Sequence, residues 1–174
     1  NFGDTLKPGS YVALNRKWSA GDVVELNFPM PVRLMEANPK VEDCRNRVAV
    51  MRGPVVYCAE FPKRDNGEQI WNDGVFLPEN AKFTQRLDKK SFGEVVVLKG
   101  QALTSKGRDQ FVTQIAAAAP PTASPDWAGQ LYRKFTPRDL KGPKSATFDV
   151  TLIPYFAWAN RGPAFMTVWI PLAR

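Results

Sequence analysis

The feature that most constrains the fold of this chain is a succession of short apolar segments separated by turn-forming residues. The 174 residues include 15 prolines and 12 glycines, and no long segment repeats with a helical period. Residues 23–28 alternate instead, so that Val24, Leu26 and Phe28 share one face and the intervening residues share the other. Short strands at close spacing with many turns predict an all-β fold, either a β-sandwich or a jelly roll.

Candidate strands run the length of the chain, and they cover residues 11–18, 23–28, 47–61 with a break at Gly53-Pro54, 75–87, 94–104, 147–158 and 165–172. The first two would form a hairpin around a tight turn at 19–22. Residues 110–121 fit a strand or, because they contain four consecutive alanines, a short helix. The polar, turn-rich segment 62–74 predicts a linker between two units.

The complete absence of histidine excludes Ser-His and Cys-His nucleophile pairs and histidine-based metal sites within these 174 residues. The two cysteines, Cys44 and Cys58, cannot by themselves make a structural zinc site, and we expect no metal or other cofactor. Cys58 lies in an apolar strand-like segment, which favours a buried free thiol. A disulfide between the two cysteines is the alternative.

The formal net charge of +7 permits binding to nucleic acid, anionic lipid or an acidic polysaccharide. The lysines and arginines are scattered, however, which is more typical of a solvated surface. No apolar run approaches the roughly 20 residues that a membrane-spanning helix needs. We therefore expect neither nucleic acid nor a membrane as a partner.

Acidic residues are candidate catalytic groups because glycoside hydrolysis generally needs two carboxylates that face each other across the sugar. Those on predicted strands should point outward and the others lie in predicted loops, so all are interpreted as solvated: Glu25, Glu36, Glu42, Asp43, Glu60 and Asp149. Cys58 has no histidine to activate it. The sequence therefore predicts no catalytic residue.

Aromatic residues in predicted loops are the remaining candidates for binding. Trp71 and Trp127 fall in polar loops, whereas Trp158 lies in the segment IPYFAWANRGP (153–163) beside Asn160 and Arg161. Aromatic faces stack on sugar rings or bases, so these five residues could form a glycan-binding or docking surface. Packing within a strand end is the competing interpretation, and it is favoured for Trp158 and its neighbour Tyr155.

Three stretches taken together resemble one protein family: GSYVALNRKWSAGDVVELNFPMPVR (9–33), VAVMRGPVVYCAE (48–60) and IPYFAWANRGP (153–163) followed by MTVWIPL. They are similar to the C-terminal region of glycoside hydrolase family 127-type proteins, the β-L-arabinofuranosidase-like enzymes. The resemblance is spread in order over nearly the whole chain. It favours a structural role for IPYFAWANRGP, with packed aromatics and a turn shaped by Asn160, Arg161 and Gly162.

The resemblance also implies a domain organisation. In that family a large (α/α)6 barrel comes first and carries the chemistry, with a cysteine nucleophile and a cysteine-rich zinc site. None of those positions has a counterpart in this sequence. Residues 1–62 then correspond to the later strands of an incomplete first β-sandwich, and residues 63–174 to a complete second one.

The leading functional hypothesis is therefore a non-catalytic C-terminal β-sandwich region of a bacterial glycan-degrading hydrolase. Its expected partner is the upstream (α/α)6 barrel of the same polypeptide, with a homodimer contact and a plant-type glycan as further expectations. A periplasmic or secreted location would suit such an enzyme. The rival hypotheses are a carbohydrate-binding module that uses exposed tryptophans and, with less support, a basic nucleic-acid-binding β domain.

Overall fold

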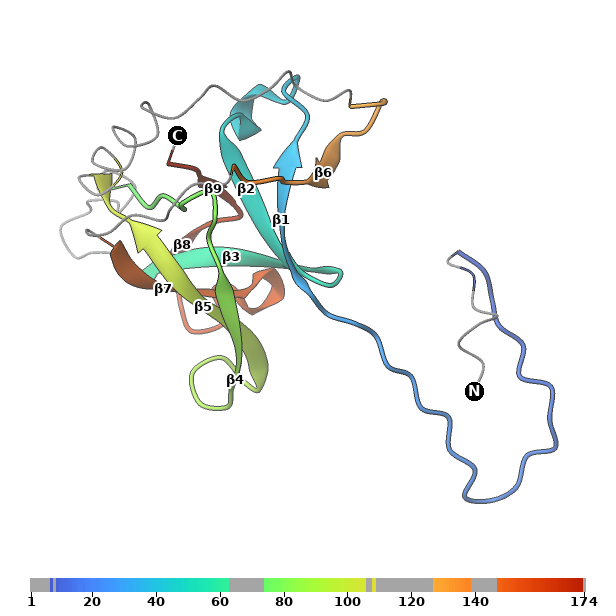
Figure 1. The fold of residues 1–174 in the computed structure, drawn as a ribbon. Coiled ribbons are helices and arrows are strands. Elements are labelled where there is room, and N and C mark those ends of the chain that lie inside the picture. The colour runs from blue at the N-terminus through green and yellow to red at the C-terminus, as the bar shows by residue number, and fades with distance from the viewer. Residues whose placement is uncertain are drawn as a thin grey trace.

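The structure of the chain is a computed structural model that describes residues 7, 9–62, 74–105, 108, 127–138 and 147–173. The strands of these residues form one curled antiparallel sheet (Figure 1). The elements, in chain order, are β1 (Val32–Ala37), a 3-10 turn η2 (Glu42–Cys44), β2 (Arg47–Arg52), β3 (Val55–Pro62), β4 (Phe83–Asp88), β5 (Val95–Leu103), β6 (Tyr132–Lys134), β7 (Thr147–Pro154), a 3-10 turn η4 (Tyr155–Ala157), β8 (Ala164–Thr167) and β9 (Trp169–Pro171).

The strand order is β4-β5-β7-β3-β2-β1-β6, with β8 added beside β3 and β9 beside β2. Neighbouring strands are antiparallel throughout these described pairs. The all-β prediction is confirmed, whereas the division into sandwich layers stays a prediction. Strands from both sides of residue 62 share this sheet, because β3 pairs with β7 and β8. That residues 1–62 also belong to a first sandwich stays a prediction.

The core lies mainly on one face of the central strands. Because side chains alternate along a strand, residues directly opposite each other on paired strands share a face. Ala59 of β3 lies opposite Leu152 of β7, which lies opposite Leu98 of β5, and all three are buried on the same face. They belong to the largest apolar cluster, together with Val48, Val50, Tyr57, Leu77, Ala102, Phe135, Val150, Ile170 and Leu172.

The other face carries a smaller apolar cluster. Cys58 and Ile153 lie opposite each other there, and Val97 and Ala157 complete the buried set. Phe92, in the loop between β4 and β5, packs against this cluster. The sheet is therefore covered on its second face by the β4–β5 loop and the segment that follows β7, and this cover positions the site described below.

The predicted break at Gly53-Pro54 is confirmed as the tight turn between β2 and β3. Gly53 has a φ of +54°, a conformation that L side chains rarely adopt, and its N–H donates to the carbonyl of Pro31 over 3.1 Å. An added Cβ would also collide with the sulfur of Met30. Glycine is required at this position both by the backbone conformation and by the close packing.

Residues 9–31 form an extended arm that leads away from the sheet and joins it at β1 (Figure 1). The predicted turn at 19–22 is confirmed, because the Asp22 N–H donates to the Ser19 carbonyl (3.1 Å) and the Ser19 N–H to the Asp22 carboxylate (2.8 Å). The predicted hairpin strands 11–18 and 23–28 are wrong, since no strand is assigned there. An isolated two-stranded hairpin is marginal in water, so alternation alone does not hold one together.

Two other sequence predictions, the linker at 62–74 and the strand or helix at 110–121, lie almost wholly or wholly outside the described residues. The remaining strand predictions are confirmed with shifted ends. Residues 147–158 divide into β7 and η4, and residues 165–172 divide into β8 and β9 around Val168. The described residues form no helix that is long and apolar enough to cross a membrane.

Candidate functional site

The candidate site is a gap in the sheet between β3 and β7. Ala59 pairs with Leu152 of β7 on one edge and with Thr167 of β8 on the other. Beyond Ala59, β3 continues to pair with β8 through Pro62, whereas its ladder with β7 stops. The register would next place Thr151 of β7 opposite Glu60, but these residues do not pair. Two strand edges therefore diverge from a common point, and a cavity lies between them.

The cavity has a volume of about 520 Å³. Its walls are Ala59, Glu60 and Phe61 of β3, the β7 residues Phe148–Thr151 and Ile153, Phe92 of the β4–β5 loop, and Arg161–Ala164 before β8. Phe61 and Phe148 pack against the larger core cluster, whereas Phe92 and Ile153 belong to the smaller one. The cavity therefore spans the sheet from one face to the other.

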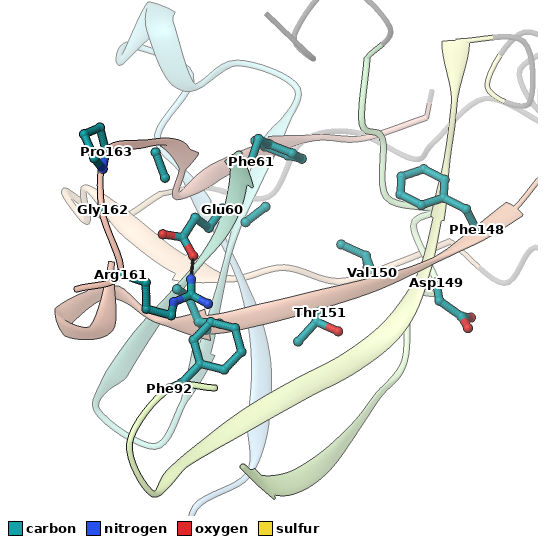
Figure 2. A pocket seen from close by; sticks show the side chains of 13 residues that line it. Glu60, Phe61, Phe92, Phe148, Asp149, Val150, Thr151, Arg161, Gly162 and Pro163 are labelled. Atoms are coloured by element: carbon teal, nitrogen blue, oxygen red, sulfur yellow. Dashed lines mark hydrogen bonds and ion pairs between the residues drawn. The ribbon is translucent and has the colours of Figure 1, made fainter. Parts of the chain in front are cut away.

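One wall of the cavity is an ion pair between Glu60 and Arg161. Arg161 Nη2 donates to Glu60 Oε2, and the backbone N–H of Ala159 donates to Glu60 Oε1 over 3.2 Å. The guanidinium also lies over the Phe92 ring, with its central carbon 3.9 Å from the ring centroid. Figure 2 shows Glu60 and Arg161 pointing toward one another, with the Phe92 ring next to the guanidinium. The Glu60 side chain is 10% exposed and that of Arg161 40%, so the pair closes one side of the cavity while the guanidinium still reaches solvent.

The opposite wall is provided by β7. Thr151 is exposed, and its hydroxyl has no hydrogen-bond partner among the described residues. Asp149 receives a hydrogen bond from the Gln101 side-chain amide of β5. Figure 2 shows its carboxylate directed away from the Glu60–Arg161 pair. The residues with polar side chains that line the cavity are thus Glu60, Arg161, Asp149 and Thr151.

The segment IPYFAWANRGP forms the turn that the sequence predicts. The 3-10 turn η4 follows Pro154, and the Gly162 N–H donates to the Ala159 carbonyl over 3.2 Å. Ala159 and Gly162 have φ values of +60° and +115°. These conformations reverse the chain and direct Arg161 back toward Glu60.

The aromatic residues of this segment are more exposed than the packing interpretation predicts. Tyr155 and Trp158 are 47% and 36% exposed, and Phe156 is 67% exposed. Tyr155 and Trp158 stack on each other with centroids 6.3 Å apart, and the Trp158 indole N–H donates to the Ala164 carbonyl over 3.0 Å. The prediction that Tyr155 and Trp158 pack in the core is wrong, because η4 turns them outward.

The five residues proposed from sequence do not form one surface in the described structure. Trp158, Asn160 and Arg161 lie together in the closing turn, and all three are exposed. Trp127 is half-buried, and the Arg133 guanidinium lies 3.9 Å from its ring centroid, which covers one ring face. Trp71 lies outside the described residues. A combined platform of tryptophans is therefore not formed by Trp127 and Trp158.

Ion pairs engage several carboxylates that the sequence interpretation placed in solvent. Glu36 accepts from Arg133 Nε over 2.8 Å, and Glu42 from Arg45 Nη2 over 3.0 Å. Sequence reasoning missed Glu79, whose side chain is 3% exposed and accepts from Arg138 Nε and Nη2, each over 2.9 Å. No local sequence pattern near Glu79 predicts this ion pair, because Arg138 is 59 residues away.

The cysteines are free thiols, as favoured for Cys58 from sequence. Burial raises the pKa of Cys58 to about 11, so its thiol is protonated at neutral pH and is a poor nucleophile. Within the described part of the chain, no group of three or more histidine, cysteine or acidic side chains is placed to hold a metal ion.

The fold and the gap define a β domain built around one curled sheet, with aromatic and charged groups gathered at the turn before β8. The family model of the glycoside hydrolase family 127 C-terminal domain matches residues 32–171. The chain therefore belongs to this family, and the resemblance drawn from its motifs is confirmed.

Three known proteins show how the chain relates to longer ones. A non-reducing end β-L-arabinofuranosidase of Bifidobacterium longum subsp. longum is 33% identical over 157 residues, which cover 87% of this chain and 20% of the relative. A solved glycoside hydrolase is 40% identical with a TM-score of 0.57, covering 92% of this chain and 22% of that one. A solved GH127 β-L-arabinofuranosidase from Geobacillus stearothermophilus T6 is 33% identical with a TM-score of 0.52, covering 83% and 19%. The chain thus spans about one fifth of the length of the relatives it matches.

Proposed function

We propose that this chain is the non-catalytic C-terminal β region of a bacterial β-L-arabinofuranosidase-like glycoside hydrolase, and that it docks against the preceding part of the same polypeptide. The observation that carries the proposal is the exposure of the arm at residues 9–31. Its large apolar side chains lie in solvent, where a folded protein would normally cover them with other residues. Its large exposed hydrophobic residues are Tyr11, Val12, Trp18, Val23, Val24, Leu26 and Phe28.

The exposure of the arm is extensive. Val23, Leu26 and Phe28 are 82%, 72% and 72% exposed. Fully burying such a side chain stabilises a protein by about 1.5–3 kcal/mol each, so a partner that covers the arm gains substantial free energy. Large apolar side chains exposed in such number along one segment are typical of an interaction site.

The greater length of the relatives supports a partner in the preceding part of the polypeptide. The domain match begins at residue 32, directly after the arm. The structural match covers 92% of the chain, which is more than residues 32–174 can supply, so the likeness extends into the arm. The relatives are about five times longer than the region they share with this chain. A preceding segment of the same polypeptide is therefore the proposed partner, as the (α/α)6 barrel or a first sandwich that the arm completes.

The proposal is tested by producing this chain and the preceding part of its polypeptide as separate fragments and measuring their association. Replacing Leu26 and Phe28 with serine should weaken association at least tenfold, because two large apolar contacts are lost. Replacing Asn15 and Asn27 with serine, in the same arm, is the matched control and should leave it unchanged. Association that is indifferent to Leu26 and Phe28 would refute docking through the arm.

Activity gives an independent test of the non-catalytic assignment. The pure chain should not hydrolyse a chromogenic β-L-arabinofuranoside, whereas the associated fragments should. Turnover by the isolated 174-residue chain would overturn the assignment.

A second candidate function, carbohydrate binding through exposed aromatics, is favoured by the stacked pair Tyr155 and Trp158. Their near-parallel rings, 19° apart, are partly open to solvent and are fixed by the hydrogen bond from Trp158 to Ala164. Titration with arabinan should quench the tryptophan fluorescence of the chain, and Tyr155→Ala should abolish the change. A homodimer contact stays a prediction.

A further inference from the structure

We propose that a second hollow, between the start of β2, strand β9 and residues 74–76, binds an organic carboxylate of the sugar-acid class, with Arg47 as its anchor. This hollow has a volume of about 390 Å³ and shares one lining residue, Phe61, with the gap between β3 and β7. The proposal rests on the proposed function only in the choice of a sugar ring as the body of the ligand.

The walls of the hollow are fixed by hydrogen bonds between its segments. The Leu172 N–H donates to the Asn46 carbonyl over 2.9 Å, and Asn46 Nδ2 donates to the Leu172 carbonyl over 3.3 Å. Residues 74–76 continue into Leu77, whose N–H donates to the Pro171 carbonyl over 2.9 Å. The segment that carries Arg47 and the segment that carries the apolar wall are therefore both attached to the last strand. A site held in this way loses little freedom when a ligand binds.

Arg47 is a half-buried cation that forms no ion pair with a carboxylate of the described residues. Its Nη1 donates to the Trp169 carbonyl over 3.2 Å, and the Thr167 hydroxyl, which also lines the hollow, donates to the same oxygen over 3.0 Å. The guanidinium is thereby held at the hollow while its other N–H groups stay available. A carboxylate can accept two such bonds side by side, and a partly desolvated charge gains from a partner of opposite sign.

The carboxylates close to Arg47 in the sequence leave its charge uncompensated. Glu42 accepts from Arg45, which also lines the hollow. Glu36 lines a smaller neighbouring hollow and accepts from Arg133. Asp43 is exposed in η2 and lines neither hollow. Among the described residues no acidic side chain lines the proposed site, so its net charge is positive and favours an anion over a neutral or cationic ligand.

The rest of the lining favours an anion with an apolar body. Val75, Phe76 and Pro171 contribute apolar surface, and the Arg108 guanidinium, 5.0 Å from the Phe76 ring centroid, adds to the positive potential. The volume of about 390 Å³ lies within the range of about 300–1,000 Å³ that is usual for small-molecule pockets. An inorganic anion would leave the apolar walls without contacts. A carboxylate carried by a sugar ring places C–H groups against them.

The test is a calorimetric titration of the full 174-residue chain with galacturonate and with galactose, which have the same ring and differ in the carboxylate. Galacturonate should bind, and galactose should bind at least tenfold more weakly because it cannot form the charge-assisted hydrogen bonds to Arg47. Inorganic phosphate should also bind at least tenfold more weakly than galacturonate, because it makes no contact with the apolar walls.

Variants then assign the binding to Arg47 rather than to the general positive charge of the chain. Arg47→Met should weaken galacturonate binding at least tenfold, and Arg47→Lys, which keeps the charge but not the planar pair of donors, should recover part of the loss. The matched control is Arg33→Met. Arg33 is also half-buried and donates to one backbone carbonyl, that of Gly53 (3.0 Å), but it does not line the hollow. Its variant should bind like the original chain.

Three results would overturn the proposal: no binding of galacturonate at concentrations of several tens of millimolar, equal binding of galactose or phosphate, or equal losses in Arg33→Met and Arg47→Met. Circular dichroism checks the folding of each variant, and the three ligands on the original chain decide the question if Arg47→Met is unfolded. Association with the preceding fragment should not change in Arg47→Met, and the serine variant at Leu26 and Phe28 should still bind galacturonate. Failure of carboxylate binding is thereby distinguished from failure of the proposed docking.

Discussion

Glu60 and Arg161 are 101 residues apart in the sequence and form the ion pair that fixes the turn before β8 to the sheet. Glu60 is on β3, and its carboxylate is engaged on both oxygens, by the Arg161 guanidinium and by the Ala159 backbone N–H. The Phe92 ring supports the guanidinium from the β4–β5 loop. Three segments that would otherwise be independent therefore meet at one pair of side chains.

Arg161→Met should destabilise the chain by about 1–2 kcal/mol, because it leaves a nearly buried carboxylate with only one backbone donor. The expected loss of stability is small because Arg161 is 40% exposed, so that solvent partly screens its attraction to Glu60. Urea unfolding measures the loss, and Arg86→Met on the exposed face of β4 serves as the control with an expected change of less than about 0.5 kcal/mol. If Arg161→Met and Arg86→Met lose the same free energy of unfolding, the ion pair does not contribute to stability.

Glu79→Gln should have a larger effect than the equivalent change at an exposed ion pair. Glu79 is 3% exposed and accepts two guanidinium bonds from Arg138 as well as the Arg138 backbone N–H over 3.1 Å. Losing one partner of such a pair leaves Arg138 uncompensated, at a cost of about 2–3 kcal/mol.

The comparison variant is Glu42→Gln, because Glu42 and Arg45 form a pair on the surface with both side chains more than half exposed. Its expected cost in urea unfolding is about 0–0.5 kcal/mol. If the two glutamine variants unfold at the same urea concentration, the buried Glu79–Arg138 pair stabilises the fold no more than the exposed Glu42–Arg45 pair.

Much of the strand pattern could be predicted from local sequence. The alternation in β7 and the Gly53-Pro54 break between β2 and β3 are local signals, since they depend on side chains a few residues apart. The turn at Ala159–Gly162 is also local, because it depends on backbone conformations that glycine and its neighbours adopt. These features were confirmed for that reason.

The gap between β3 and β7 could not be predicted, because it depends on register between strands far apart in the chain. Two local sequence patterns gave wrong predictions. Residues 11–18 and 23–28 alternate like strands, but within this chain they have no sheet to join. The outward position of Tyr155 and Trp158 follows from the 3-10 turn after Pro154, whereas a continuous strand would have buried alternate rings. Glu79 and Arg138 meet only through the tertiary fold.

Alkaline pH should destabilise the chain through Cys58. Burial raises the pKa of this thiol from 9.0 to about 11 in the folded state. Between these values the unfolded chain releases the thiol proton while the folded chain retains it, so stability is fully present below pH 9 and falls as the pH rises toward 11. Cys58→Ala should be less stable than the original chain at pH 8, because it leaves a small cavity, but should lose less stability between pH 9 and 11.

Urea midpoints at pH 8, 9, 10 and 11 measure this dependence for both chains. Cys44→Ala is the control, because Cys44 is only half-buried although burial also raises its pKa. Parallel pH profiles for the original chain and Cys58→Ala would show that the thiol does not titrate with a raised pKa.

Removing residues 1–28 should leave the stability of the sheet almost unchanged. The described arm makes its few hydrogen bonds mostly within itself, as in the pairing of Arg16 with Asp22. The contacts that join it to the sheet begin at Met30 and Pro31, which meet Gly53 and Gln85. We expect the free energy of unfolding measured in urea to change by less than about 1 kcal/mol. Exposed residues that pack against nothing contribute little to stability.

The same truncation should strongly reduce the binding of a hydrophobic dye such as ANS, because it removes the exposed apolar side chains of the arm. Extending the deletion through Ala37 should unfold the sheet, because β1 bridges β2 and β6 in the strand order. A large loss of stability on removing residues 1–28 alone would mean that the arm packs on its own sheet, and the apolar surface would then be unavailable to the preceding polypeptide. Unchanged stability with lost dye binding and lost fragment association would assign the arm to an interface between the two parts of the protein.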